Sequence, residues 1–544
     1  MAGSPAARDR ARPAAVLVGI VALAVYRTTL LPGVGAWDTA EAQTVLPLLG
    51  TMHPTGFPAF VVLGWLASIV LRPLGEPAFI ENLLAAGLVA TAAGGTVLVV
   101  RRLGVPTAIA AAAGLGLALT PIAWHVSAAA DAHALHLALL VGLVLALLRW
   151  ADRVAERDAA GDGETAAGAT SGEPRLRARA DRALVLAAVV GGVAAANHGL
   201  AFLLVPPVAL YALRTDRRLR HRPRAGLAAI GAAIAAAGVL YLELPIRAGL
   251  LRAPLVYGHP ETPGGFLDVV LGRQFAGDLG GSLADPGGMR GALAGLAGSQ
   301  LGPLALVALV GLAVTARRRP RYALLSGTAA GITVLFAATY ANADIGRYYV
   351  GPAFFAWTWL AVLAGSVAER LAPRPPADDA EADVTEADPD IAVPGRRPIP
   401  ASTLVAGLVA LGLLVPTAAG LDARWHAADR SRERWAAEWV DETFTALAPD
   451  AAVVSWWSYS TTMWYAQLVE GRRQDILIID DRTLLDDNLG SAADAIDRLL
   501  ETRPVYVIRA TESDLQTLRQ RFAIEPVGRP SELYRVTGRL ETAP

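Results

Sequence analysis

Long apolar stretches are the feature that most constrains this chain. A helix needs about 20 predominantly apolar residues to cross the hydrocarbon core of a bilayer. Such runs recur along most of the sequence, and they predict eleven spans at 13–31, 79–100, 105–123, 132–149, 183–196, 199–213, 225–243, 301–316, 323–339, 349–369 and 402–420. One further apolar run, 58–71, is too short to assign by length alone. The pattern predicts a polytopic α-helical membrane protein.

The composition agrees with this prediction. Of the 544 residues, 54 % are hydrophobic and only 18 % are charged, whereas soluble domains carry about 25 % charged residues. The chain has no cysteine, which excludes disulfides, thiolate zinc sites and cysteine nucleophiles. All 48 basic residues are arginine, and the net charge of −1 gives no indication of a nucleic-acid partner.

The arginines predict the orientation of the spans. Arg8, Arg10 and Arg12 precede the first span, so the N-terminus is expected in the cytoplasm. If 58–71 lies in the plane of the membrane, the later arginine clusters also fall inside, at 101–102, 149–157, 175–182, 214–224, 317–321 and 396–397. If 58–71 crossed the membrane, all of these arginine clusters would fall outside. We therefore predict a multi-pass plasma-membrane protein with a cytoplasmic N-terminus and an outer C-terminus.

This topology divides the chain into four parts. Residues 1–370 form a membrane module with a first outer loop (32–78) and a second outer loop (244–300). An acidic cytoplasmic linker (371–401) leads to the last span (402–420), and 421–544 form a domain outside the membrane.

The outer domain differs in pattern from the rest of the chain. Short apolar runs at 451–455, 475–480 and 504–509 are typical of buried strands. Predicted helices alternate with them at 425–447, 458–470, 491–502 and 512–521. This order predicts a small α/β domain with a largely parallel sheet.

Ionisable residues gather at the predicted outer surface, where they are functional candidates. Asp38 and Glu41 are three residues apart, so on a helix they share a face. Two such carboxylates can serve as a general base and as a ligand for a cation or a hydroxyl group. The alternative is a helix capping box. His53 lies in a turn rich in Pro and Gly, where it is either a pocket ligand or a structural histidine.

A third cluster lies at the outer ends of the third and fourth predicted spans. It contains His125, Asp131, His133 and His136, and His198 follows at a later outer turn. Histidine and carboxylate side chains suit zinc, but the spacing lacks a His-x-x-x-His pair, so we predict no metal site.

Seven arginines lie on the outer side against the topology rule, at 27, 72, 247, 252, 273, 290 and 347. A guanidinium binds a phosphate group, such as that of a lipid, by paired hydrogen bonds. The alternative for each of these arginines is a solvated charge in a loop. Arg247 follows Leu-Pro-Ile at a helix end, and Arg347 lies in a short polar loop with Asp344. Both are therefore pocket candidates.

Aromatic residues cluster in the outer domain at Trp456, Trp457 and Tyr459. Aromatic faces stack on sugar rings or anchor a domain at the lipid interface, and the alternative is core packing. The domain contains no Gly-rich phosphate loop, so a nucleotide site is not expected.

Several of these motifs occur in an order that resembles a known family. The order is Asp38-x-x-Glu41, His53-Pro-x-Gly-x-Pro58, Asn82 in the next helix, Asn197-His198, Leu244-Pro-Ile-Arg247, Gly258-His-Pro-Glu-Thr262, Gly272-Arg-Gln-Phe275 and Tyr340 to Tyr349. It resembles transmembrane O-mannosyltransferase-like proteins of the GT-C glycosyltransferases, whose eukaryotic members O-mannosylate plexin-type receptor domains. The resemblance covers residues 13–370, and Thr55 departs from it where the family more often has proline.

The resemblance implies a membrane enzyme that takes a sugar, mannose or another hexose, from a polyprenyl-phosphate donor. The sugar passes to a hydroxyl acceptor, a protein or a glycan, with inversion and without a further cofactor. Asp38 would be the base, and Glu41 would shape the site or share that role. His53, Asn82, His133, His198, Arg247, Arg273, Asp344 and Arg347 would form the donor-phosphate site or its pocket, and Trp456, Trp457 and Tyr459 would contact the acceptor or its glycan.

Two other functions fit the same spans. A transporter or flippase for lipid-linked or anionic substrates also places polar residues in the membrane. It is disfavoured because no inverted repeat is visible. A non-catalytic scaffold or sensor would use the outer domain to bind a ligand, and it predicts that Asp38 and Glu41 are dispensable.

Overall fold

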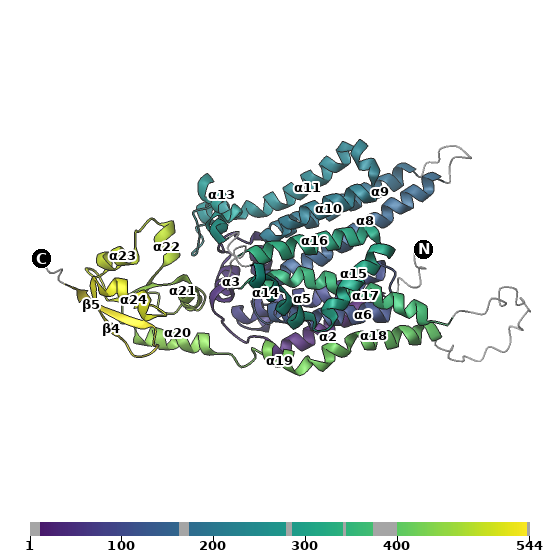
Figure 1. The fold of residues 1–544 in the computed structure, drawn as a ribbon. Coiled ribbons are helices and arrows are strands. Elements are labelled where there is room, and N and C mark those ends of the chain that lie inside the picture. Colours follow the sequence, from purple (N-terminus) through teal and green to yellow (C-terminus); the bar gives the residue numbers. More distant parts are fainter. Residues whose placement is uncertain (1–10, 163–172, 279–285, 341–343, 374–399, 541–544) are drawn as a thin grey trace, which may run out of the picture.

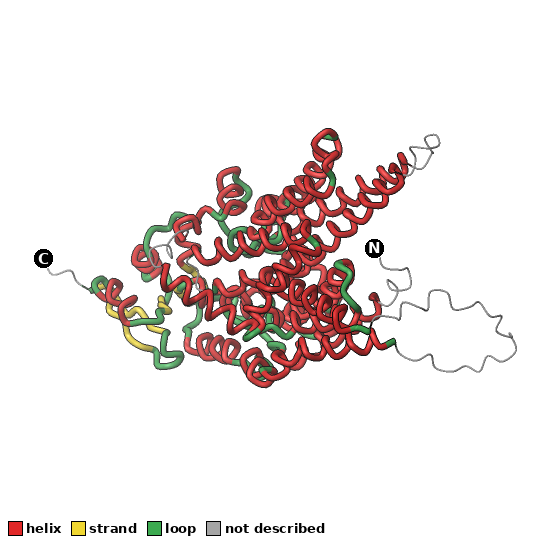
Figure 2. The backbone as a smooth tube through the Cα atoms, turned by 45° about the vertical axis from the view of Figure 1, so that its right-hand side comes forward, coloured by secondary structure: helices red, strands yellow, loops and turns green. Residues whose placement is uncertain are grey.

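The chain has two parts, a bundle of long helices and a small domain at one end of it (Figure 1). The computed structural model describes residues 11–162, 173–278, 286–340, 344–373 and 400–540. The predicted linker, 371–401, lies mostly outside these residues. Helix dominates the bundle, and all strands in the described part belong to the small domain (Figure 2).

Seven helices of the described part are long and apolar enough to cross a membrane. They are α2 (Ala11–Thr29), α5 (Pro77–Arg102), α8 (Ala132–Asp162), α11 (Pro223–Tyr241) with its extension to Leu250, α16 (Pro320–Thr339), α17 (Val350–Leu371) and α18 (Ala401–Ala419). Two bent pairs raise the number to nine: α6 (Thr107–Ala118) with α7 (Pro121–Ser127) at 64°, and α14 (Pro286–Leu301) with α15 (Leu304–Arg318) at 91°. The predicted multi-pass architecture is confirmed.

The two shortest predicted spans are helical but do not meet the same criterion. The first, 183–196, lies in α9 (Glu173–Ala195), whose first half is rich in arginine. The second, 199–213, is divided between the 3₁₀ helix η2 (Gly199–Leu204) and α10 (Val205–Thr215). A further 3₁₀ helix, η3 (Arg217–His221), precedes α11. The total of eleven spans therefore stays a prediction.

Short helices lie at the end of the bundle next to the small domain. The first outer loop contains α3 (Trp37–Leu48), α4 (Pro58–Val70) and η1 (Arg72–Leu74). The second contains α12 (Glu243–Pro245), η4 (Ile246–Leu250), α13 (Pro263–Leu271) and η5 (Arg273–Asp278). Helix α4 has 13 residues and packs on α3 and α5, so it is too short to cross a bilayer as one helix.

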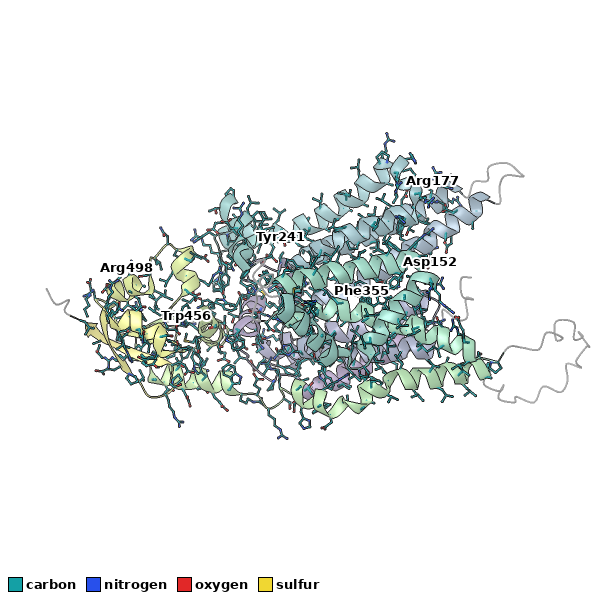
Figure 3. All side chains as sticks on the ribbon, viewed as in Figure 1. Asp152, Arg177, Tyr241, Phe355, Trp456 and Arg498 are labelled. Atoms are coloured by element: carbon teal, nitrogen blue, oxygen red, sulfur yellow. The ribbon has the colours of Figure 1, made fainter. Side chains whose placement is uncertain are left out.

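The core of the bundle is formed by α2, α5, α6, α8 and α17. Small residues let these helices approach closely, as in other membrane bundles. A Cβ on Gly94 of α5 would lie 2.6 Å from the carbonyl oxygen of Ala15 on α2. Within this core, Tyr26 donates its hydroxyl to the carbonyl oxygen of Ala118 at 2.8 Å. Phe355 marks the middle of the bundle in Figure 3.

The small domain contains a five-stranded mixed sheet in the order β2-β1-β3-β5-β4. β1 (Ala452–Ser455), β2 (Leu477–Asp480) and β3 (Val505–Ile508) are parallel and match the three predicted strands. β4 (Phe522–Pro526) and β5 (Leu533–Arg539) are antiparallel and were not predicted. β4 lies at the sheet edge and β5 lies between it and β3, and both contain exposed residues, unlike the buried β1 and β3.

Helices flank the sheet in the order α20 (Trp435–Ala446), α21 (Trp457–Trp464), the π-helical turn η9 (Tyr465–Val469), α22 (Asp481–Asp486), α23 (Ala492–Leu499) and α24 (Glu512–Arg519). The predicted helix 425–447 is wrong as one element, because α19 (Leu421–Ala428) ends before α20 begins. Between them Arg430 forms an ion pair with Glu433 at 2.7 Å, and its backbone N–H donates to the carbonyl of Thr29 at 3.0 Å.

The small domain contacts both outer loops. The backbone N–H of Ala78 in the first outer loop donates to the hydroxyl of Tyr465 at 3.1 Å. The indole N–H of Trp457 donates to the hydroxyl of Tyr257, a buried residue of the second outer loop, at 2.7 Å. The three segments predicted to lie outside therefore meet at one end of the molecule (Figure 1).

Candidate active site

The site begins at the start of α3, which presents two carboxylates in different directions. The residue before the helix, Ala36, provides no side-chain cap, so Asp38 and Glu41 do not form the capping box considered above. Glu41 is completely buried, whereas the Asp38 carboxylate is 35 % exposed. Asp38 is therefore the carboxylate that a substrate can approach.

Asp38 belongs to a cluster of charges centred on Arg347. This arginine lies on η7 (Ile345–Tyr349), directly before α17. Its Nη2 donates to Oδ2 of Asp38 at 2.6 Å, and its Nη1 donates to Oδ2 of Asp131 at 3.3 Å. Its Nε lies 3.1 Å from Oδ2 of Asp344. One guanidinium thus joins three carboxylates from separate parts of the sequence.

Asp131 extends this cluster toward the histidines. Its Oδ1 accepts from the backbone N–H of His133 at 2.7 Å and from Nδ1 of that ring at 2.9 Å. The ring of His133 lies 4.5 Å from the ring of His198 and 5.2 Å from that of Tyr348, between ring centroids. His136 is also next to His198, at 5.8 Å. The structure therefore brings together the residues that the sequence placed at two separate outer turns.

Glu41 pairs with His53 on the other side of α3. Glu41 Oε1 accepts from the backbone N–H of His53 at 2.7 Å, and its Oε2 pairs with Nδ1 of the ring. A tight turn follows, closed by a bond from the N–H of Gly56 to the carbonyl of His53 at 2.8 Å. Gly56 has φ +79°, a conformation in which glycine is favoured. The turn aims His53 at Glu41 and starts α4.

The charges alter the pKa values of both acidic and basic groups. Burial alone would raise the pKa of Asp38, but the positive charges of His53 and Arg347 outweigh it, and that pKa is lowered. Burial alone would lower the pKa of His53, but Glu41 outweighs it, and the pKa of His53 is raised. Burial lowers the pKa of His198 well below its ordinary value. Asp38 is thus ionised near neutral pH, and His198 is neutral.

Asn82 and Arg247 hold the backbone of the first outer loop. The amide of Asn82 donates to the carbonyl of Gly33 at 3.1 Å and accepts from Nε2 of Gln43, a residue of α3, at 2.8 Å. Arg247 donates from Nη2 to the carbonyl of Leu48 at 3.0 Å and from Nε to that of Leu49, at the end of α3. Both residues therefore position α3.

Three further predicted residues pair with partners outside this cluster. Arg273 is exposed and pairs with Asp268 at 2.7 Å. Trp456 is 38 % exposed and stacks over Arg509, with 5.0 Å between the guanidinium carbon and the ring centroid. Tyr459 packs on Trp439.

Trp457 is the aromatic residue of the small domain that contacts the candidate site. Its ring edge meets His53 at 5.7 Å, between ring centroids. Figure 3 marks its neighbour Trp456 in the small domain.

The roles of Asp131, His136 and Tyr348 were not assigned from the sequence. Asp131 and His136 belong to the cluster that the sequence indicates, but spacing alone does not show that Asp131 joins His133 to Arg347. Tyr348 directly follows Arg347 and has no such signal. Within the described ranges, no group of three or more His, Asp or Glu side chains is arranged to hold a metal ion.

Comparison with known proteins relates this site to a family. Residues 38–221 match the family model described as the N-terminal domain of protein O-mannosyl-transferase TMEM260. This stretch contains Asp38, Glu41, His53 and the cluster from Asp131 to His198, whereas Arg347 lies beyond it.

The fold is shared with solved membrane glycosyltransferases. ArnT from Cupriavidus metallidurans, bound to undecaprenyl phosphate, has a TM-score of 0.55 at 15 % identity, over 96 % of this chain and 97 % of that one. The oligosaccharyltransferase of Archaeoglobus fulgidus, tethered to an acceptor peptide, has a TM-score of 0.51 at 15 % identity, over 97 % of this chain and 74 % of that one. At these identities the likeness shows the fold, and the family match adds the enzyme class. The chain is therefore a multi-pass membrane glycosyltransferase with the GT-C fold, and its residues 38–221 are similar to the N-terminal domain of protein O-mannosyl-transferase TMEM260.

Proposed function

We propose that the protein transfers mannose or another hexose from a polyprenyl-phosphate donor to a hydroxyl acceptor outside the membrane. The observation that carries the proposal is the position of Asp38, a partly exposed carboxylate held ionised at the loop end of the bundle. An ionised carboxylate beside a bound hydroxyl group acts as a general base.

In this reaction Asp38 accepts the proton of the acceptor hydroxyl. The acceptor oxygen attacks the anomeric carbon of the sugar from the face opposite the phosphate. A new carbon–oxygen bond forms as the bond from the anomeric carbon to the phosphate oxygen breaks, and the lipid phosphate leaves with that electron pair. A single displacement of this kind inverts the anomeric centre.

Arg347 is the arginine that best suits the departing phosphate. Charge builds on the phosphate oxygens as the bond breaks, and a fixed cation nearby stabilises it. Arg347 lies 2.6 Å from Asp38, whereas Arg247 is bound to the end of α3 and Arg273 pairs with Asp268. The donor carries its own leaving group, so we propose that no further cofactor takes part.

The structural neighbours support a lipid-linked donor and a peptide acceptor. AglB from Archaeoglobus fulgidus was solved with an inhibitory peptide and a dolichol-phosphate, and it has a TM-score of 0.50 at 14 % identity, over 97 % of this chain and 75 % of that one. By analogy we propose that a protein, or alternatively a glycan, is bound between the outer loops and the small domain. Trp456, Trp457 and Tyr459 are the proposed acceptor contacts.

Replacement of Asp38 tests the proposal. In a strain that lacks the gene, the glycan that is lost identifies the acceptor. Expression of the intact protein restores that glycan. We expect Asp38→Asn to reduce transfer by about 100- to 10,000-fold, the usual contribution of a general base. Asp422→Asn is the matched control, because the Asp422 side chain is 94 % exposed on α19. Near-normal glycan levels with Asp38→Asn, at equal protein abundance, contradict the role of Asp38.

A further inference from the structure

Three buried polar atoms near Arg347 have no hydrogen-bond partner within the described part of the chain. They are Nε2 of His133, Nδ1 of His136 and Oδ1 of Asn197. These residues are 5 %, 4 % and 0 % exposed, respectively. An unpaired buried polar atom costs about 1–3 kcal/mol, so native proteins rarely retain several together without a reason.

The three atoms belong to one cluster built from two elements. His133 and His136 lie in the first turns of α8, and their rings are 4.5 Å and 5.8 Å from the ring of His198. Asn197 directly precedes His198, and its Nδ2 donates to the carbonyl of Ala132 at 3.1 Å. That bond fixes the turn before η2 against the start of α8.

The hydrogen-bond character of the cluster is set by its surroundings. His133 donates its Nδ1 proton to Asp131, so in the neutral ring Nε2 carries a lone pair. Oδ1 of Asn197 can only accept. His198 Nδ1 accepts from the N–H of Leu200 at 3.1 Å, so the proton of this neutral ring is on Nε2. The cluster therefore offers an acceptor at Oδ1 of Asn197 and a donor at Nε2 of His198, and a neutral His133 adds a second acceptor.

Acceptors of this kind match hydroxyl groups better than a phosphate. An ionised phosphate has no protons to donate at its oxygens, whereas each hydroxyl of a sugar donates one. The chain of contacts from His133 through Asp131 and Arg347 to Asp38 places the cluster beside the candidate base. The rings of Tyr348 and Phe57 pack around His198, at 5.5 Å and 5.4 Å.

We propose that His133, His136 and Asn197 form the subsite that binds the hydroxyl groups of the donor sugar and so selects which sugar is transferred. This inference rests on the proposed function and specifies one part of the same site. A site built to hydrogen-bond a hydroxyl group rejects a donor that lacks it, because buried polar atoms are then left unpaired.

Binding to the purified full-length protein tests the proposal without an acceptor. The probes are polyprenyl-phosphate mannose, the corresponding glucose, galactose and arabinose lipids, and bare polyprenyl phosphate. We expect the intact protein to bind one sugar-bearing lipid about 10- to 100-fold more tightly than bare polyprenyl phosphate. His136→Phe should lose most of this preference while keeping its affinity for bare polyprenyl phosphate. His125→Phe, an exposed histidine at the same end of the bundle, is the matched control and should keep the preference.

Monodeoxy analogues of the preferred donor give a test that needs no variant. At least one analogue should bind the intact protein about 10-fold or more weakly than its parent. The proposal is overturned if every analogue binds like its parent, or if a folded His136→Phe protein retains the full preference. These outcomes leave the proposed function standing, because that depends on the loss of transfer in Asp38→Asn.

Discussion

At the scale of single residues, the site depends on which charges are paired with which. Arg347 pairs with Asp38 and Asp131, while His53 pairs with Glu41. Removing one partner of a buried pair is strongly destabilising, because it leaves the other charge unpaired. The two pairs flank α3; the positive charges of Arg347 and His53 hold Asp38 ionised, and Glu41 is paired with His53.

The pair of Glu41 and His53 predicts a pH-dependent stability. The pKa of His53 is raised above its ordinary 6.5 by Glu41, after burial has acted to lower it. A group whose pKa is raised by folding stabilises the protein fully below its unfolded pKa, and the effect is lost as pH rises through the folded pKa. We therefore expect Tm of the intact protein to exceed that of His53→Gln by a few degrees at pH 6.

This difference should shrink as the pH rises from 6.5 through the raised pKa. Thermal unfolding of both proteins in detergent between pH 5.5 and 9 measures it. A difference in Tm that stays constant over that range would falsify the ion pair.

At the scale of elements, α3 is held at both ends by groups that the sequence suggested for the donor phosphate. The amide of Asn82 bonds the carbonyl of Gly33 before the helix and the side chain of Gln43 within it, and Arg247 bonds the last carbonyls of the helix. Cations at a helix C-terminus also interact favourably with the helix dipole. α3 is therefore fixed by long-range contacts rather than by its own caps.

Replacement of Arg247 distinguishes a helix anchor from a phosphate ligand. Arg247→Ala removes two charge-assisted hydrogen bonds to carbonyl groups, so we expect it to destabilise the protein by about 1–3 kcal/mol. Arg252→Ala, which alters an exposed arginine of the same loop, is the control. Unfolding measurements and donor titrations on both variants separate the roles. An unchanged Tm with a higher KM for the donor would show that Arg247 binds phosphate instead.

At the scale of the whole molecule, the chemistry gathers at one end. The first outer loop, the second outer loop and the small domain contact each other there, while ion pairs of arginine with aspartate lie toward the other end, near Asp152 and Arg177 (Figure 3). A lipid-linked sugar has its reactive group at the membrane surface, so a site at the end of the bundle suits it. The orientation in the membrane follows from the arginine pattern and stays a prediction.

The absence of cysteine makes that orientation directly testable. A cysteine introduced by Asp422→Cys is the sole thiol of the chain and lies on α19, beside the small domain. We expect it to react with a membrane-impermeant maleimide on intact cells. A cysteine introduced by Glu156→Cys, at the other end of α8, should react only after the cells are permeabilised. The reverse pattern of labelling would show that the N-terminus lies outside.

The sequence by itself determined the architecture, because apolar runs and turn residues act locally. The spans, the short helix α4 and the three parallel strands all follow from runs of neighbouring residues. The same local reasoning failed at β4 and β5, whose stability comes from pairing with β3 and with each other. It also failed between α19 and α20, where the N–H of Arg430 bonds to the carbonyl of Thr29, about 400 positions away.

Only the tertiary structure decided which candidate residues act together. Asp38 and Arg347 are 309 positions apart, and spacing along the chain carries no information about such a contact. The sequence named both residues because an ionisable group at a membrane surface is costly, yet it ranked Arg247 and Arg273 with Arg347. The fold gives these three arginines different partners. Arg347 pairs with Asp38, Arg247 bonds the end of α3, and Arg273 pairs with the exposed Asp268. Local composition determines where a chain crosses the membrane, whereas long-range packing determines which charges meet.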